Sequence, residues 1–156
     1  MHIYRSALLR FQEDGQAVHE EDGLLAIGPD ALGRERVQAV GAWHQLASRF
    51  AGHPVTHWPG RLIAPGFVDM HVHYPQTDVI GSPAEGLLPW LENYTFPHEK
   101  RFVAQGYAAQ VAEFFLDELL RNGVTTALAF ATSHPQSVDA LMTEAQARGL
   151  RLIAGK

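Results

Sequence analysis

The most informative stretch of this 156-residue chain is Pro65-Gly66-Phe67-Val68-Asp69-Met70-His71-Val72-His73-Tyr74-Pro75-Gln76. Its central residues, 67–72, are apolar except for Asp69, and this pattern predicts a β-strand. The Pro-Gly pair before the strand and Pro75 after it are typical chain breakers, so the strand is expected to end just before Pro75. Parallel α/β sheets carry their chemistry at the carboxyl ends of the strands, and two histidines of this stretch fall there.

These histidines, His71 and His73, are separated by one residue. Side chains on a strand alternate between its faces, so the two imidazoles point the same way from Cα atoms about 6.6 Å apart. Two imidazoles at this spacing can converge on one metal ion about 2.0–2.1 Å from each nitrogen. Met70 and Val72 are then expected on the opposite, buried face. The chain has nine histidines, so a pair of hydrogen-bonded structural histidines is the alternative to a metal site.

The composition is that of a soluble globular protein, with 46% apolar residues and a net charge of −5. Acidic and basic residues are interspersed, so no nucleic-acid-binding patch is expected. The chain has no cysteine, which excludes disulfides, thiolate nucleophiles, cysteine-ligated zinc and the deaminases with a Pro-Cys-x-x-Cys signature. The first residues do not resemble a signal peptide, and no apolar run approaches the length of a membrane span. We therefore expect a cytoplasmic protein that binds no membrane.

The first part of the chain, residues 1–64, has the short strands and frequent turns of a small β-sandwich. Strands are predicted at 3–11, 16–20, 24–27, 36–40, 54–58 and 61–63. The dipeptide Asp22-Gly23 between two of these strands predicts a tight hairpin turn. A short helix is expected over 43–50.

The second part, residues 65–156, has an alternating α/β pattern. After the first strand, an irregular stretch rich in proline and glycine is expected up to about residue 105. Further elements are predicted in the order helix 107–120, strand 125–130, helix 137–148 and strand 151–154. This order predicts parallel strands with right-handed crossovers. Three strands do not close a barrel of about 250 residues, so either a small open sheet or the front portion of a longer protein is expected.

Several of these motifs resemble a known family. The pattern Pro-Gly-Phe-Val-Asp-x-His-x-His, from Pro65 to His73, resembles the first barrel strand of the metal-dependent amidohydrolase superfamily. Later blocks are similar to the guanine deaminases within it. They are His-Tyr-Pro-Gln-Thr-Asp at 73–78, Gly-Leu-Leu-Pro-Trp-Leu at 86–91, Tyr-Thr-Phe-Pro at 94–97 and Phe-Ala-Thr-Ser-His at 130–134. The resemblance extends over essentially the whole chain.

The resemblance implies a fold in which a small composite β-sandwich precedes a (β/α)₈ barrel. Residues 1–64 would supply the N-terminal part of the sandwich, and residues 65–156 the first three strands and two helices of a barrel that stays incomplete in this chain. The implied reaction is the zinc-dependent hydrolytic deamination of guanine to xanthine and ammonia. A homodimer is implied for the complete protein.

The resemblance also implies individual roles. His71 and His73 match the family's strand-one ligands for one Zn²⁺ ion, with iron as the alternative metal. Gln76 matches a glutamine that contacts the substrate. The family's other ligands and the glutamate that transfers protons lie beyond the position of Lys156, so this segment alone is expected to be inactive.

Four other residues have side chains that could contribute to the site. Trp90 is a candidate for contact with a flat purine, together with Phe96, and packing within a long loop is the alternative for both. Asp69 is a candidate for orienting a hydrogen-bond network inside the barrel, or for a structural cap. His134 follows the strand predicted at 125–130 and is interpreted as structural.

Two other interpretations remain open at this point. An amidohydrolase for another purine, a pterin or a triazine fits the same motifs, because ring selectivity depends on groups outside this segment. A non-catalytic α/β binding module, in which the two histidines are structural, belongs to a different class. Lys156 is not interpreted as a metal-bridging lysine.

Overall fold

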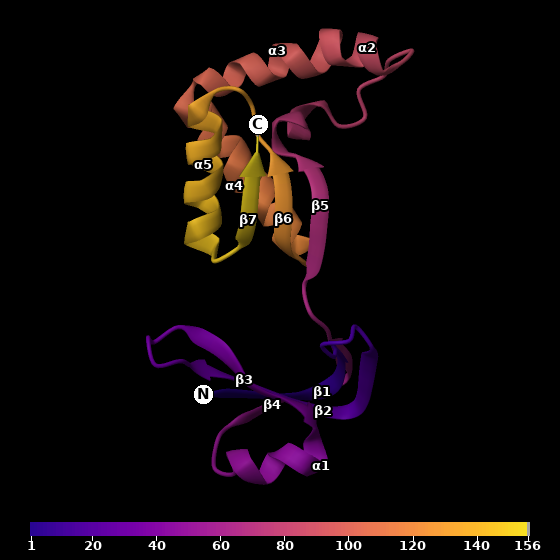
Figure 1. Cartoon of the computed structure of the whole chain (residues 1–156), viewed down its shortest axis with the longest axis vertical. Coiled ribbons are helices and arrows are strands. Elements are labelled where there is room, and N and C mark those ends of the chain that lie inside the picture. The colour runs from indigo at the N-terminus through magenta and orange to yellow at the C-terminus, as the bar shows by residue number, and fades with distance from the viewer. Residues whose placement is uncertain (156) are drawn as a thin grey trace. The chain divides into compact units, whose positions relative to one another are not determined.

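The computed structural model describes residues 1–155, and Lys156 lies outside the described residues (Figure 1). The chain divides into two compact units, one from Met1 to Pro65 and one from Gly66 onward. No helix in the described part of the chain has the length and apolar character that crossing a membrane requires.

The first unit is a four-stranded sheet with the strand order β3-β2-β1-β4. Its strands are β1 (His2–Phe11), β2 (Ala17–Pro29), β3 (Glu35–Ala42) and β4 (Val55–Ile63). A short helix α1 (Trp43–Leu46), continued by the 3₁₀ turn η1 (Ala47–Phe50), packs on the buried side chains of the sheet. Residues 1–65 thus supply one sheet, and the second sheet that a sandwich requires stays a prediction.

The predicted hairpin turn at Asp22-Gly23 is wrong, because both residues lie within the single strand β2. The Asp22 carboxylate accepts two hydrogen bonds of 2.7 Å from the Arg5 guanidinium on the neighbouring strand. Gly23 faces Leu8, and a Cβ atom at Gly23 would lie 2.3 Å from the Leu8 Cγ atom. The dipeptide therefore serves cross-strand packing, and the chain turns instead at residues 12–16, before β2 begins.

The second unit is a parallel sheet with the order β5-β6-β7, as predicted. Its strands are β5 (Phe67–His73), β6 (Val124–Phe130) and β7 (Arg151–Gly155), and they are joined by α4 (Gln105–Arg121) and α5 (Pro135–Arg148). Pro135 begins α5, and Gly149, in the left-handed conformation at φ 65°, ends it. The sheet is open, so closure of a barrel stays a prediction.

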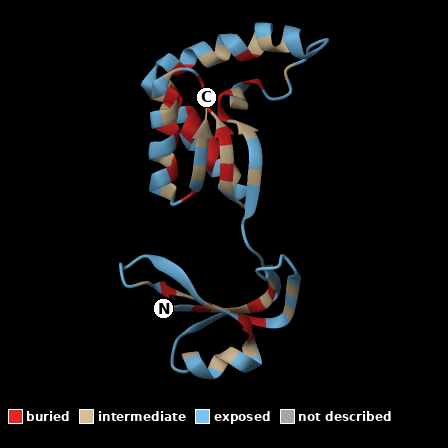
Figure 2. Ribbon diagram, in the orientation of Figure 1, coloured by how far each residue is buried: buried red, intermediate tan, exposed pale blue. Residues whose placement is uncertain are grey.

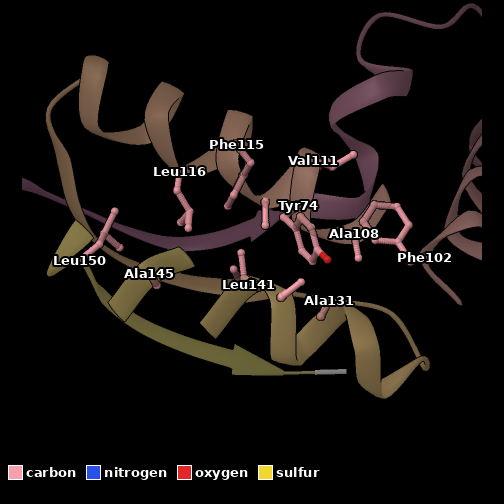
Figure 3. Packing of buried hydrophobic residues seen from close by; sticks show 13 residues of the cluster. Tyr74, Phe102, Ala108, Val111, Phe115, Leu116, Ala131, Leu141, Ala145 and Leu150 are labelled. Atoms are coloured by element: carbon pink, nitrogen blue, oxygen red, sulfur yellow. The ribbon is translucent and has the colours of Figure 1, made fainter. Parts of the chain in front are cut away.

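One hydrophobic cluster fills the space between α4, α5 and the sheet (Figures 2 and 3). Its largest fully buried members are Tyr74, Phe102, Leu116 and Leu141. The apolar residues of α4 recur at helical spacing, so the helix buries one stripe against α5 and β6. This packing fixes the carboxyl ends of β5 and β6 relative to each other.

The stretch between β5 and α4 is mostly helical, so the prediction of an irregular segment is wrong. It contains η2 (Tyr74–Val79), α2 (Leu87–Trp90), the π-helical turn η3 (Leu91–Thr95), α3 (Phe96–Glu99) and η4 (Lys100–Val103). Prolines stand in the first turns of η2 and α3. A helix tolerates proline there because the amide of its first turn has no partner within the helix.

We predict that Leu116→Ala destabilises the second unit by about 2–5 kcal/mol, because it leaves a cavity in the core between α4 and α5. Leu116 is fully buried, whereas Leu120 on the same helix is 39% exposed. Leu120→Ala is the matched control and should cost about 1 kcal/mol or less. Urea unfolding followed by far-UV circular dichroism measures both changes, and equal losses would contradict this assignment of the core.

Candidate metal centre

β5 carries a bulge that includes His71, the first residue of the histidine pair. Asp69 pairs with Ala127 and Val72 with Ala129, so β5 advances by one residue more than β6 over this stretch. The Asp69 carboxylate accepts a hydrogen bond of 3.0 Å from the backbone N–H of His71 within the bulge. A carboxylate that accepts from the backbone N–H two residues on is the pattern of a local structural cap, and a role of Asp69 in a wider hydrogen-bond network stays a prediction.

The burial of the β5 side chains differs from the predicted alternation. Met70 is 66% exposed, so the prediction that it is buried is wrong. Val72 is half-buried and packs against the core cluster. Phe67 and Val68 are exposed as well, because β5 is the edge strand of the described sheet and neither face of its first part is covered.

The side chains of His71 and His73 converge. Their Nε2 atoms lie 3.2 Å apart, and their ring centroids are separated by 5.1 Å. Two nitrogens that each bind one tetrahedral ion at about 2.0–2.1 Å lie about 3.3–3.4 Å from each other. The pair therefore fits two neighbouring positions on one metal ion. The same separation also allows one ring to donate a hydrogen bond to the other.

Phe130 holds the ring of His73 in place, a role that the sequence analysis missed. The two rings stack with centroids 4.7 Å apart and an interplanar angle of 18°. Phe130 is the last residue of β6 and pairs with His73, the last residue of β5. The order of the elements predicts that both strands end at the same edge of the sheet, but it does not predict the register that pairs Phe130 with His73.

The surroundings of His73 favour its neutral form. Burial lowers the pKa of His73, and the positive charge of protonated His71 lowers it further. A neutral imidazole is the form that binds a metal ion. The electrostatics of the strand end therefore agree with the donor chemistry of a metal site.

A cavity of about 720 Å³ adjoins the histidine pair. It lies among β5, η2 and α4, and Gln76 on η2 lines it together with His71 and His73. Apolar side chains of α4 form much of the remaining wall, with Phe114, Phe115 and Leu119 among them. The structure thus brings together three of the residues that the sequence marks.

Trp90 is not among the residues that line this cavity. It lies half-buried on α2, and its contact with a substrate stays a prediction. Phe96 lines a different cavity of about 320 Å³, together with Glu99, Lys100, Ser133 and His134. Burial raises the pKa of Glu99, and the nearby His134 opposes this shift.

Comparison with known proteins identifies the family. A sequence profile described as the amidohydrolase family matches residues 62–156, which include β5 and the histidine pair. The chain belongs to the amidohydrolase family.

Several members of this family are similar to this chain in both sequence and structure. Escherichia coli guanine deaminase is 46% identical over 140 residues, which cover 87% of this chain and 30% of that protein. Its solved structure superposes on the whole chain with a TM-score of 0.89, and the chain covers 37% of it. Guanine deaminase from C. acetobutylicum, solved with bound guanine in its active site, has a TM-score of 0.84 at 27% identity, with coverage of 99% and 36%.

A more distant structure shares the fold alone. Atrazine chlorohydrolase from Arthrobacter aurescens TC1, solved in complex with zinc, is 21% identical with a TM-score of 0.77, and the chain covers 35% of it. The match includes 99% of this chain. The chain spans 30–37% of the length of the relatives and structures described here.

Within residues 1–155 of this amidohydrolase, no third histidine, cysteine, aspartate or glutamate joins the pair to form a metal-binding group. A catalytic zinc ion takes three or so protein ligands. The described residues thus provide two ligand candidates, both on one strand.

We predict that Asp69→Ala weakens Zn²⁺ binding by the complete gene product that carries this chain by about 10- to 100-fold, because the backbone of His71 loses its hydrogen-bond acceptor. Asp69→Asn is the matched control, since its amide oxygen can still accept the bond. Isothermal titration with Zn²⁺ at fixed pH measures the three affinities. Unchanged affinity in Asp69→Ala would remove Asp69 from the centre.

Proposed function

We propose that this chain is the N-terminal part of a zinc-dependent guanine deaminase, which hydrolyses guanine to xanthine and ammonia. The observation that carries the proposal is the convergence of the His71 and His73 Nε2 atoms to 3.2 Å at the end of β5. The 46% identity to Escherichia coli guanine deaminase supports it. The guanine-bound neighbour supports guanine over another purine, a pterin or a triazine.

His71 and His73 would hold the zinc ion, and iron would fit the same nitrogen donors. When bound, zinc lowers the pKa of a coordinated water to about 7 and so supplies hydroxide at neutral pH. Phe130 fixes the ring plane of His73, and Asp69 fixes the backbone of His71. The remaining ligands and the glutamate that transfers protons are proposed to come from chain beyond Lys156.

Gln76 is proposed to contact the purine. Its amide has both a hydrogen-bond acceptor and two donors, which suits the mixed polar edge of guanine. It lines the same cavity as the histidine pair. In the overall reaction, the oxygen of one water replaces the 2-amino group; one hydrogen of the water converts that group to ammonia, and the other stays on xanthine.

The wider organisation of the protein is proposed on the same basis. Residues 1–64 would form part of a composite β-sandwich, and residues 65–156 the beginning of a (β/α)₈ barrel. The complete protein is proposed to be a cytoplasmic homodimer that binds neither nucleic acid nor membranes.

We predict that the complete gene product, loaded with zinc, converts guanine to xanthine, and that His71→Ala and His73→Ala each lower kcat/KM by at least about 100-fold. Each substitution removes a nitrogen donor and should also lower the zinc content. Loss of guanine absorbance, release of ammonia and metal analysis measure these effects. The 156-residue chain alone is expected to be inactive, because its described residues, 1–155, provide two ligand candidates.

His53→Ala is the matched control, since His53 is exposed in the turn before β4, and it should leave activity and zinc content unchanged. Turnover of a pterin or a triazine without turnover of guanine would contradict the proposed substrate. Full zinc content in both His71→Ala and His73→Ala would support the interpretation that the pair is structural.

A further inference from the structure

The segment η2, which carries Gln76, is anchored firmly at its beginning. Tyr74 is fully buried, and its hydroxyl donates a hydrogen bond of 2.9 Å to the backbone carbonyl of Ser137 at the start of α5. The Tyr74 ring meets the buried Phe102 ring edge-on, with centroids 5.0 Å apart. Figure 3 shows Tyr74 and Phe102 in the core cluster between the helices. The position two residues before Gln76 is therefore fixed by the core.

The same segment is anchored at its other end by Asp78, two residues after Gln76. The Asp78 carboxylate accepts a hydrogen bond of 2.5 Å from the hydroxyl of Tyr107, in the first turn of α4. Arg101 reaches the same carboxylate oxygen at 3.8 Å, and its guanidinium lies 4.0 Å above the Tyr107 ring. The following stretch, residues 80–86, contains no helix or strand. Asp78 is thus a polar anchor just before the chain enters that stretch.

The two anchors share one aromatic cluster. The ring of Phe102 contacts Tyr74 on one side and Tyr107 on the other, with centroids 5.0 and 5.1 Å away. Burial raises the pKa of Tyr107 to about 12, and its bond to Asp78 adds to this shift. The hydroxyl therefore stays protonated and donates to Asp78 at neutral pH.

Gln76, between the anchors, has its side chain free for a ligand. Within residues 1–155, no group hydrogen-bonds to its amide, and Gln76 lines the cavity beside His71 and His73. A substrate-contacting amide gains affinity when the backbone that carries it is already ordered, since less conformational entropy is lost on binding.

We propose that Tyr107 and Arg101 are positioning residues for Gln76: by holding Asp78, they fix the segment η2 so that the Gln76 amide faces the histidine pair and a purine bound there. The inference rests on the proposed role of Gln76 in a guanine deaminase. The Tyr107 hydrogen bond contributes more than the Arg101 contact, because that ion pair is long and its side chains are half-exposed.

The experiment compares Tyr107→Phe with the wild type in the zinc-loaded complete gene product. The substitution removes one hydroxyl and keeps the ring that packs on Phe102 and Arg101. We expect KM for guanine to rise about 5- to 10-fold, with a smaller change in kcat and the same zinc content. Hydrogen exchange of the backbone amides of residues 74–80 should become faster. Tyr4→Phe, in the first unit, is the control and should change none of these quantities.

A double-mutant cycle tests whether Tyr107 acts through Gln76. In a Gln76→Ala background, Tyr107→Phe should leave KM unchanged, because the amide that it positions is gone. An equal rise in KM in both backgrounds would overturn the inference, and so would unchanged hydrogen exchange in the single variant. An inactive wild type would instead overturn the proposed function, and this outcome is distinguished by the wild-type assay alone.

Discussion

The last paired residues of β5 and β6 are the constraint on which the candidate centre depends. His73 pairs with Phe130 in the parallel ladder, so the backbone hydrogen bonds that align the strands also place an aromatic ring against the imidazole. The bulge before this pair directs His71 toward the same point, and Asp69 holds its backbone there. The convergence of the two nitrogens is therefore built by the pairing of β5 with β6 and by the contacts of Phe130 and Asp69.

The parts of this arrangement that the sequence predicts are those with a local signal. The apolar spacing in residues 107–120 and 137–148 indicates the two helices, and both form. The parallel order of the strands follows from that alternation and is confirmed. The exposure of Met70 follows instead from the position of β5 at the edge of the described sheet, and the stacking of Phe130 depends on how β5 aligns with β6. A local sequence window does not contain that information, because the two strands are separated by the whole of the intervening loop and helix.

The dipeptide Asp22-Gly23 shows that a local sequence signal can also be overruled by contacts with distant residues. Its local preference is for a turn, yet both residues lie within β2. Two long-range contacts outweigh that preference: Arg5 holds the Asp22 carboxylate, and Leu8 is buried in the space that a side chain at position 23 would fill. An Asp-Gly pair therefore predicts a hairpin only where no neighbouring strand offers such partners.

The contacts of the histidine pair and of Gln76 show which parts of a metal centre this chain provides. The described groups that orient His71, His73 and Gln76 all come from the second unit, between Asp69 and Ser137. Within residues 1–155, no third ligand candidate joins the histidine pair. The stacking of Phe130 on His73 and the bond of Asp69 to the His71 backbone restrict both residues, so less conformational entropy is lost when the pair binds a ligand. A group that completed the coordination would meet donors already in place, and such preorganisation is what keeps a first-strand site precise enough for chemistry.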